Sequence, residues 1–270
     1  MKKIIALFIS ILSFNCSEAQ NKKPFVLGII DSIKSVQLSE TRILNIYLPD
    51  GYQQNDTAKY PVIYLLDGSA DEDFIHISGL VQFLNFSWVN VLPKSIVVGI
   101  ANVDRRRDFT FPTQNKEDLK TCPTSGSSEK FISFIEKELQ PYIQKNYKTN
   151  SQKTIIGESL GGLLATEILL KKPFLFNDYI IVSPSLWWND ESLLSQAQES
   201  LKKNLNTNLK VYVSVGNEGE QMQNDVNKLI SILQGFANEK LKLYYCPFPE
   251  ENHATIMHRS VYKAFEMLNK

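Results

Sequence analysis

The sequence predicts an α/β protein with a mainly parallel sheet of eight strands and helices on both faces. Short apolar runs rich in β-branched residues alternate along the chain with longer segments of helical periodicity, a pattern typical of parallel sheets covered by helices. Hydrophobic residues make up 43% of the chain and charged residues 21%, which suits one large buried core. No repeat, low-complexity linker or charge block marks a second domain, so residues 20–270 are predicted to form a single domain.

Each element is expected from its own local pattern. The predicted strands are short and apolar, and they lie at Val26–Ile33, Ile43–Leu48, Val62–Leu66, Ile96–Ile100, Thr154–Ile156, Tyr179–Val182, Val211–Val215 and Leu241–Tyr245. The first two or three of them are candidates for an antiparallel edge. The predicted helices show an apolar repeat of helical period, and they lie at Ser128–Ile143, Leu160–Lys171, Glu191–Lys203, Met222–Phe236 and Thr255–Leu268.

The charge balance bears on the kind of partner. The chain has 270 residues with 29 basic and 29 acidic side chains, so its formal net charge is zero. Because no local basic patch is present either, nucleic acid is not an expected partner, and a small molecule is favoured. The apolar residues are too many for a disordered chain, and they are not gathered into the several long runs of a many-spanning membrane protein.

Residues 1–19 have the pattern of a secretory signal peptide. Lys2 and Lys3 precede the apolar run Ile4–Phe14, and small residues up to Ala19 provide a cleavage site. The run is shorter than the roughly 20 residues that span a bilayer, so the processed chain is expected in the periplasm or outside the cell, without a transmembrane span. Cys16 leaves lipoprotein anchoring as a less favoured alternative.

Cleavage after Ala19 would leave two cysteines, Cys122 and Cys246. An oxidising compartment permits a disulfide between them. Two thiols so distant in sequence are more often independent, so both alternatives stay open.

The most informative segment is the motif Gly-x-Ser-x-Gly at residues 157–161, which follows an apolar strand and precedes a helix. In that context it predicts a nucleophile elbow, a sharp turn that exposes Ser159 at the carboxyl edge of the sheet. Gly157 and Gly161 are expected because a Cβ at either position would collide with the adjacent strand and helix. The Leu160 amide, at the positive end of the helix, is placed to stabilise an oxyanion.

A serine nucleophile needs a base, and in this chain order the base and its acid follow the serine. The chain has three histidines. His253 lies in the predicted loop between the last strand and the last helix, where the base is expected. His76 precedes the serine, and His258 is expected inside the last helix in a surface or capping role.

The acid is expected at the end of the strand Val211–Val215, where Glu218 and Glu220 follow. Glu218 is nearer the strand end and is the preferred candidate for orienting His253 by accepting its Nδ1 proton. Glu220 is the second candidate. A third alternative is that neither acts and that both are exposed loop charges or helix N-terminal charges.

A second oxyanion donor is expected in the loop after the strand Val62–Leu66. Gly68 allows the backbone to approach a substrate carbonyl closely, and the backbone amide of Asp67 or of Gly68 is the candidate. The Asp67 carboxylate is not a natural oxyanion partner, so it is expected to bond local backbone amides and hold the turn.

Several segments together resemble the putative esterase family of α/β hydrolases, which includes esterase D-like enzymes and bacterial siderophore esterases. They are Tyr60–Gly68, Arg107–Thr110, Glu138–Ile143, Gly157–Gly162, Ser183–Trp188 and Asn252–His253. The resemblance covers nearly the whole processed chain in order. It implies the α/β-hydrolase fold and hydrolysis of carboxylic esters through an acyl-enzyme formed on Ser159 with His253 as base. Siderophore esters and acylated sugars are the candidate substrates.

Substrate contacts are less defined by the sequence. Trp187 and Trp188 are candidates to line the pocket, with core packing an equal alternative for one of them. Arg107, beside Arg105 and Arg106, is a candidate contact for an anionic substrate, although pairing with nearby carboxylates is the commoner role of such arginines. The histidines lack metal-ligand spacing, and no nucleotide-binding glycine motif occurs, so neither a metal nor another cofactor is expected.

The sequence therefore predicts a serine esterase. Acyl transfer to another acceptor would use the same residues, because the dryness of the pocket decides whether water or an alcohol attacks the acyl-enzyme. A hydrolase-fold binding protein without catalysis is the alternative from another class, and it would require a broken set of catalytic residues.

Overall fold

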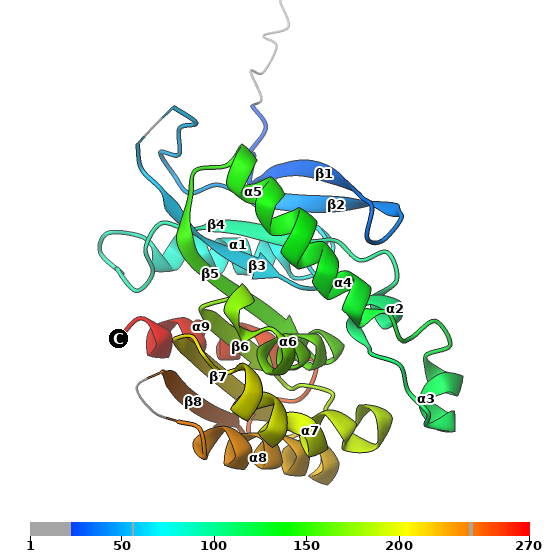
Figure 1. Cartoon of the computed structure of the whole chain (residues 1–270). Helices are drawn as coiled ribbons and strands as arrows, with labels where there is room; N and C mark the ends of the chain where they lie inside the picture. The colour runs from blue at the N-terminus through cyan, green and yellow to red at the C-terminus, as the bar shows by residue number, and fades with distance from the viewer. Residues whose placement is uncertain (1–22, 56, 238–239) are drawn as a thin grey trace, which may run out of the picture.

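A computed structural model describes residues 23–55, 57–237 and 240–270. They form one eight-stranded sheet in the order β1-β2-β4-β3-β5-β6-β7-β8 (Figure 1). The strands are β1 Ile29–Ser35, β2 Glu40–Tyr47, β3 Tyr60–Leu65, β4 Ile96–Ile100, β5 Thr149–Glu158, β6 Asp178–Val182, β7 Leu209–Gly216 and β8 Leu241–Phe248. The predicted eight-stranded α/β architecture is thereby confirmed.

The sheet is mixed at one edge. Strand β2 runs antiparallel to both of its neighbours, β1 and β4. All other neighbouring strands are parallel. The antiparallel edge expected from the sequence is therefore present, and the long run of parallel strands brings their carboxyl ends to one side of the molecule.

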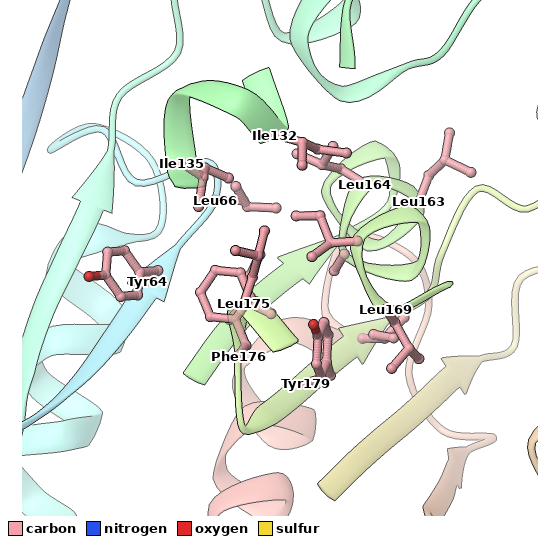
Figure 2. Packing of buried hydrophobic residues seen from close by; sticks show 14 of the residues in the cluster. Tyr64, Leu66, Ile132, Ile135, Leu163, Leu164, Leu169, Leu175, Phe176 and Tyr179 are labelled. Carbon is pink, nitrogen blue, oxygen red and sulfur yellow. The ribbon is translucent and has the colours of Figure 1, made fainter. Parts of the chain in front are cut away.

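Both faces of the sheet are buried, which explains why the central strands are apolar throughout. In β3, Val62 and Tyr64 pack into a core on one face, whereas Ile63 and Leu65 pack into a core on the other. Figure 2 shows the first core, where Leu66 lies next to Ile135 and Tyr64 lies beside Phe176. Successive side chains of a strand point to opposite faces, so one short run serves two cores.

Helices cover the two faces unequally. The first core contains side chains from α4, α5, α6, α7 and α8, and the second contains those of α1 and α9. The bounds are α1 Phe74–Leu84, α2 Arg105–Phe109, α3 Lys116–Thr121, α4 Ser128–Phe134, α5 Gln140–Asn146, α6 Leu160–Lys171, α7 Trp188–Asn204, α8 Glu220–Gln234 and α9 Ile256–Leu268. No helix among the described residues is long and apolar enough to cross a membrane.

The predicted helices are confirmed, with two differences. The expected helix Ser128–Ile143 is α4 and α5 joined by a π-helical stretch, Ile135–Leu139. The sequence pattern predicted no firm helix at α1, α2 or α3. Helices α2 and α3 have five and six residues, too few for an apolar period to emerge.

Candidate active site

The elbow at the end of β5 places Ser159 in a strained conformation. Its φ and ψ are 58° and −119°, a region that non-glycine residues adopt only when their surroundings hold them there. The backbone bonds that do so run from Ser159 N to Val182 O, at 3.1 Å, and from Ser185 N to Ser159 O, at 3.0 Å. The loop after β6 thus clamps the elbow.

Gly157 confirms the steric reason for a glycine before the serine. A Cβ there would lie 2.3 Å from the Gly161 carbonyl oxygen, which is not tolerable. Gly161 differs from the expectation, because its nearest obstacle is neither the strand nor the helix. A Cβ at Gly161 would lie 3.3 Å from Asp67 Oδ2, in the loop after β3.

The loops after β7 and β8 bring Glu218 and His253 together. His253 Nδ1 lies 2.5 Å from Glu218 Oε2, and the Glu218 side chain is only 2% exposed. Glu218 Oε1 accepts hydrogen bonds from the Gly216 amide, at 2.8 Å, and from the Ser183 hydroxyl. Glu220 is exposed at the start of α8 and makes no such contact with His253 in the described chain.

The contact shifts both titrations in the directions that favour an ion pair. Burial opposes ionisation of Glu218, but its hydrogen bonds outweigh burial and hold the pKa of this carboxyl below its usual range. The hydrogen bond to Glu218 raises the pKa of His253, against a smaller opposing effect of burial. The carboxylate thus fixes the Nδ1 tautomer and stabilises an imidazolium.

The Ser159 hydroxyl has a different partner in this structure. Its Oγ lies 3.3 Å from Ser185 Oγ, and no hydrogen bond joins it to His253 within the described residues. Catalytic hydrogen bonds in ligand-free sites often tighten only when substrate is bound. The sequence pattern assigned no role to Ser183 or Ser185. Their position directly after a central parallel strand could have indicated that both hydroxyls lie at the same edge of the sheet as Ser159.

The oxyanion candidates differ in their availability. The Leu160 amide opens α6 and donates to no described group outside that helix. The Gly68 amide already donates to Ile100 O at 3.1 Å, which corrects the expectation that it could serve as the second donor. Among its neighbours, the Asp67 amide has no acceptor in the described chain, and the Ser69 amide makes only a 3.3 Å contact with Glu72.

The Asp67 carboxylate does not bond local backbone amides as expected. It accepts hydrogen bonds from Arg105 Nε and a terminal guanidinium nitrogen, at 2.6 and 2.9 Å, and from Asn102 Nδ2 at 2.7 Å. The same arginine nitrogen that contacts Oδ2 donates to the Glu158 carbonyl at 3.2 Å. Arg105 therefore ties the loop after β3 to the elbow, a role the sequence did not reveal.

Of the three candidate substrate contacts, two are engaged in other interactions. Trp188 is fully buried and donates its indole N–H to Phe111 O at 2.8 Å, so it is a core residue and not a pocket wall. Trp187 is half-buried. Arg107 pairs with Asp108 and Glu40, each at 2.8 Å, which corrects its candidacy as a free cation for an anionic substrate.

The other two histidines pair with each other. His258 Nδ1 lies 2.5 Å from His76 Nε2, across the contact between α9 and α1. His258 is exposed in the first turn of α9, as expected from the sequence, but its contact with His76 was not expected. In the described parts of the chain, no group of three or more histidine, cysteine or carboxylate side chains is arranged to hold a metal ion.

A strained Ser159 between a central strand and a helix, with a histidine and a carboxylate from later loops at the same sheet edge, defines an α/β hydrolase. Comparison with known families makes this specific. The family described as "Putative esterase" matches residues 35–256, and the chain belongs to it. The protein is a carboxylic ester hydrolase.

Individual relatives agree with the family. The chain is 29% identical over 238 residues to the ferri-bacillibactin esterase BesA of Bacillus subtilis, covering 81% of this chain and 82% of the relative. It is 27% identical over 170 residues to a siderophore triacetylfusarinine C esterase of Aspergillus fumigatus, covering 59% and 56%. An IroE-like serine hydrolase from Shewanella oneidensis superposes with a TM-score of 0.82 at 29% identity, over 90% of this chain and 80% of that one.

Proposed function

We propose that the chain hydrolyses esters through an acyl-enzyme on Ser159. His253 Nε2 takes the hydroxyl proton while Oγ attacks the ester carbonyl, and the Leu160 amide with an unoccupied amide of the loop at residues 67–69 stabilises the oxyanion. The intermediate collapses as His253 gives its proton to the leaving alcohol. Water then attacks the acyl-enzyme, with His253 again as base, and releases the acid and Ser159.

One observation carries this proposal. Glu218 is buried, has a lowered pKa and contacts His253 Nδ1, while two further donors hold its other oxygen. A carboxylate held this way orients an imidazole so that Nε2 faces the neighbouring nucleophile. A binding protein that had lost catalysis would have no need of such a buried carboxylate, whose burial is costly.

The names of the relatives support siderophore esters as the substrates. BesA and the fungal relative are named as esterases of ferri-bacillibactin and of triacetylfusarinine C. We propose an iron-chelating oligoester as the natural substrate class. Acylated sugars form the comparison class, because a short acyl ester on a polyol offers the same scissile bond.

The location is proposed from the sequence alone. Residues 1–19 form the candidate signal peptide, and Cys16 the alternative lipid anchor; both lie outside the described residues. We propose export to the periplasm or beyond. Mass spectrometry of the protein from the exporting cell distinguishes a chain beginning at Gln20 from one that is lipidated at Cys16.

The function is tested with chain 20–270 on four substrate types: short and long acyl p-nitrophenyl esters, a triacetylated sugar and a ferric catecholate trilactone. One substrate should be cleaved faster than the others by orders of magnitude. Ser159→Ala should fold normally and lose about 10⁵ to 10⁶ in kcat. His253→Ala should lose about as much, and the double variant should hardly lose more. Wild-type activity in Ser159→Ala would overturn the mechanism.

A further inference from the structure

Arg105 connects the elbow to the loop that offers the second oxyanion donor. Its Nε and Nη2 donate to the two carboxylate oxygens of Asp67, at 2.6 and 2.9 Å, and Nη2 also donates to the Glu158 carbonyl at 3.2 Å. Glu158 directly precedes Ser159 in the chain. One guanidinium therefore sets the distance between the nucleophile and this loop. The planar fork of an arginine allows such a double contact, whereas the ammonium of a lysine does not.

The loop after β3 has a strained backbone that needs such support. The φ angle of Asp67 is 53°, a left-handed conformation that costs energy for a residue with a side chain. The Asp67 carbonyl accepts a hydrogen bond from the Asp73 amide at 3.2 Å. Its carboxylate accepts a third hydrogen bond from Asn102 Nδ2, at 2.7 Å, in addition to the two from Arg105. Side chains that follow β4 therefore hold the turn that presents the backbone amides of this loop.

The Arg105 side chain is itself held in place. Its guanidinium carbon lies 5.6 Å from the centre of the Phe109 ring, one turn further along α2, which is within the range of a cation–π contact. The Phe109 side chain is buried in the first core, so the ring has a fixed position. The side chains of Arg105 and Asp67 are 33% and 12% exposed, and water therefore screens their ion pair less than it would on an open surface.

The Asp67 carboxylate lies where a negative charge would oppose the proposed reaction. A Cβ at Gly161 would be 3.3 Å from Asp67 Oδ2, so this oxygen lies against the first turn of α6, whose Leu160 amide is the first oxyanion donor. A carboxylate without a counter-charge at this place would repel the oxyanion. The guanidinium of Arg105 offsets that charge.

We propose that Arg105 is a positioning residue for the oxyanion hole. It holds the loop after β3 against the elbow, so that an unoccupied amide of residues 67–69 and the Leu160 amide meet the same oxyanion, and it neutralises the Asp67 carboxylate beside them. Arg105 acts through Asp67 and not by touching the ester. This inference rests on the proposed function, since it concerns the same Ser159 site. Because the oxyanion exists only after the attack begins, loss of Arg105 should lower kcat and leave KM nearly unchanged.

Variants separate the fork of Arg105 from its charge, with a neutral ester, p-nitrophenyl butyrate, as the substrate. Arg105→Gln removes both and should lower kcat on the order of 10²-fold. Arg105→Lys keeps the charge without the fork and should lower kcat on the order of 10-fold. Asp67→Asn, added to Arg105→Gln, removes the carboxylate left without a counter-charge and should recover part of the loss. Arg106→Gln is the matched control and should resemble the wild type, because Arg106 is exposed in the same helix and has no hydrogen bond to Asp67 in the described chain.

A pair of ketone inhibitors distinguishes positioning of the oxyanion hole from a merely structural role. With an alkyl trifluoromethyl ketone, Ser159 Oγ bonds to the carbonyl carbon, His253 takes the hydroxyl proton, and the carbonyl oxygen takes the electron pair and becomes an oxyanion. The matching methyl ketone hardly adds and reports on binding alone. In Arg105→Gln the inhibition constant of the trifluoromethyl ketone should rise by the same factor as kcat/KM falls, and that of the methyl ketone should stay near the wild-type value.

The outcomes separate the inference from the function on which it rests. A wild-type kcat in folded Arg105→Gln overturns the role of Arg105, and so does an equal loss of affinity for both ketones, which would indicate a damaged pocket. If Arg105→Gln does not fold, Arg105→Lys decides by the same two measurements. If the wild type cleaves no ester in a Ser159-dependent way, the proposed function itself fails.

Discussion

Glu218 illustrates how much one side chain depends on its neighbours for its chemistry. A glutamate in an exposed loop would be a solvated charge, yet here it is almost fully buried and held by the Gly216 amide, the Ser183 hydroxyl and His253. Each donor favours the ionised form against the cost of burial. The result is a carboxylate that stays ionised and keeps the imidazole in one orientation.

The first prediction compares Glu218→Gln with Glu220→Gln. Loss of the Glu218 charge leaves the serine, the base and the oxyanion donors in place, so kcat should fall by about 10² to 10⁴ with little change in KM. Glu220→Gln should be close to wild type, because that side chain is exposed and does not contact His253. A large loss confined to Glu220→Gln would move the acid there, and small losses in both would indicate a dyad of Ser159 and His253.

The second prediction concerns the pH profile. The general base must be neutral, so activity is full above the pKa of His253 and is lost as the pH falls through it. Because Glu218 raises this pKa, the acid limb of kcat/KM for a neutral ester should lie above the usual histidine value of about 6.5. In Glu218→Gln the limb should move to lower pH. An unmoved limb would mean that another group controls it.

At the scale of elements, the site is assembled where the segments that follow β3, β4, β5, β6, β7 and β8 meet, and side-chain and backbone hydrogen bonds between these segments hold them together. Arg105 joins the loop after β3 to the elbow, and the loop after β6 clamps Ser159 from the other side. On the second face of the sheet, His76 and His258 join α1 to α9. Burial, with His258 nearby, lowers the pKa of His76 to about 4.

The third prediction follows from this lowered pKa. The unfolded chain, with a histidine pKa near 6.5, binds more protons than the folded one between about pH 6.5 and 4, so stability is full above that window and falls as the pH drops through it. His76 is half-buried, and Arg259 and Lys263 also line its cavity. After a discount for solvent screening, its share of the loss is about 1 kcal/mol.

Urea unfolding at pH 7 and pH 4.5 measures this contribution. The wild type should lose about 1 kcal/mol more between the two pH values than His76→Leu does. Glu220→Gln, which changes an exposed charge outside the pair, should follow the wild type. Equal losses in the wild type and His76→Leu would show that the histidine pair does not link protonation to the packing of α1 on α9.

At the scale of the whole molecule, the fold is held by packing and not by a covalent link between its two described cysteines. Cys122 is buried at the end of α3, Cys246 lies in β8, and both are free thiols. The alternative of a disulfide between them, left open by the sequence, is therefore wrong. Two apolar cores on opposite faces of one sheet supply the stability instead.

The fourth prediction is that reductant does not change the stability of chain 20–270. A bridge closing so long a loop would contribute up to several kcal/mol, so its removal would lower Tm by many degrees. We expect the same Tm within about 1 °C with and without reductant. Thiol titration in denaturant without reductant should find both cysteines reactive. A drop in Tm on reduction would show that a disulfide forms.

The local sequence by itself determined the strands, the longer helices and the elbow, because each depends on a pattern within a few neighbouring residues. Apolar β-branched runs indicated the eight strands, and the glycines around Ser159 indicated a turn that only a missing Cβ permits. The family and the ester chemistry were also within reach of the sequence. The structure brings the Glu218 and His253 side chains together. Their roles as catalytic acid and base stay a prediction.

Only the tertiary structure decided which neighbours each of the remaining groups meets. Nothing local shows that the Gly68 amide is bonded to Ile100 on another strand. Nor does it show that Arg107 pairs with Glu40, or that Arg105 braces the elbow. Nor does the motif around Ser159 reveal that Glu158 Oε1 is buried without a hydrogen-bond partner among the described residues. These are contacts between segments far apart in the chain, and burial and pairing, which set the charge and availability of a polar group, arise from such contacts alone.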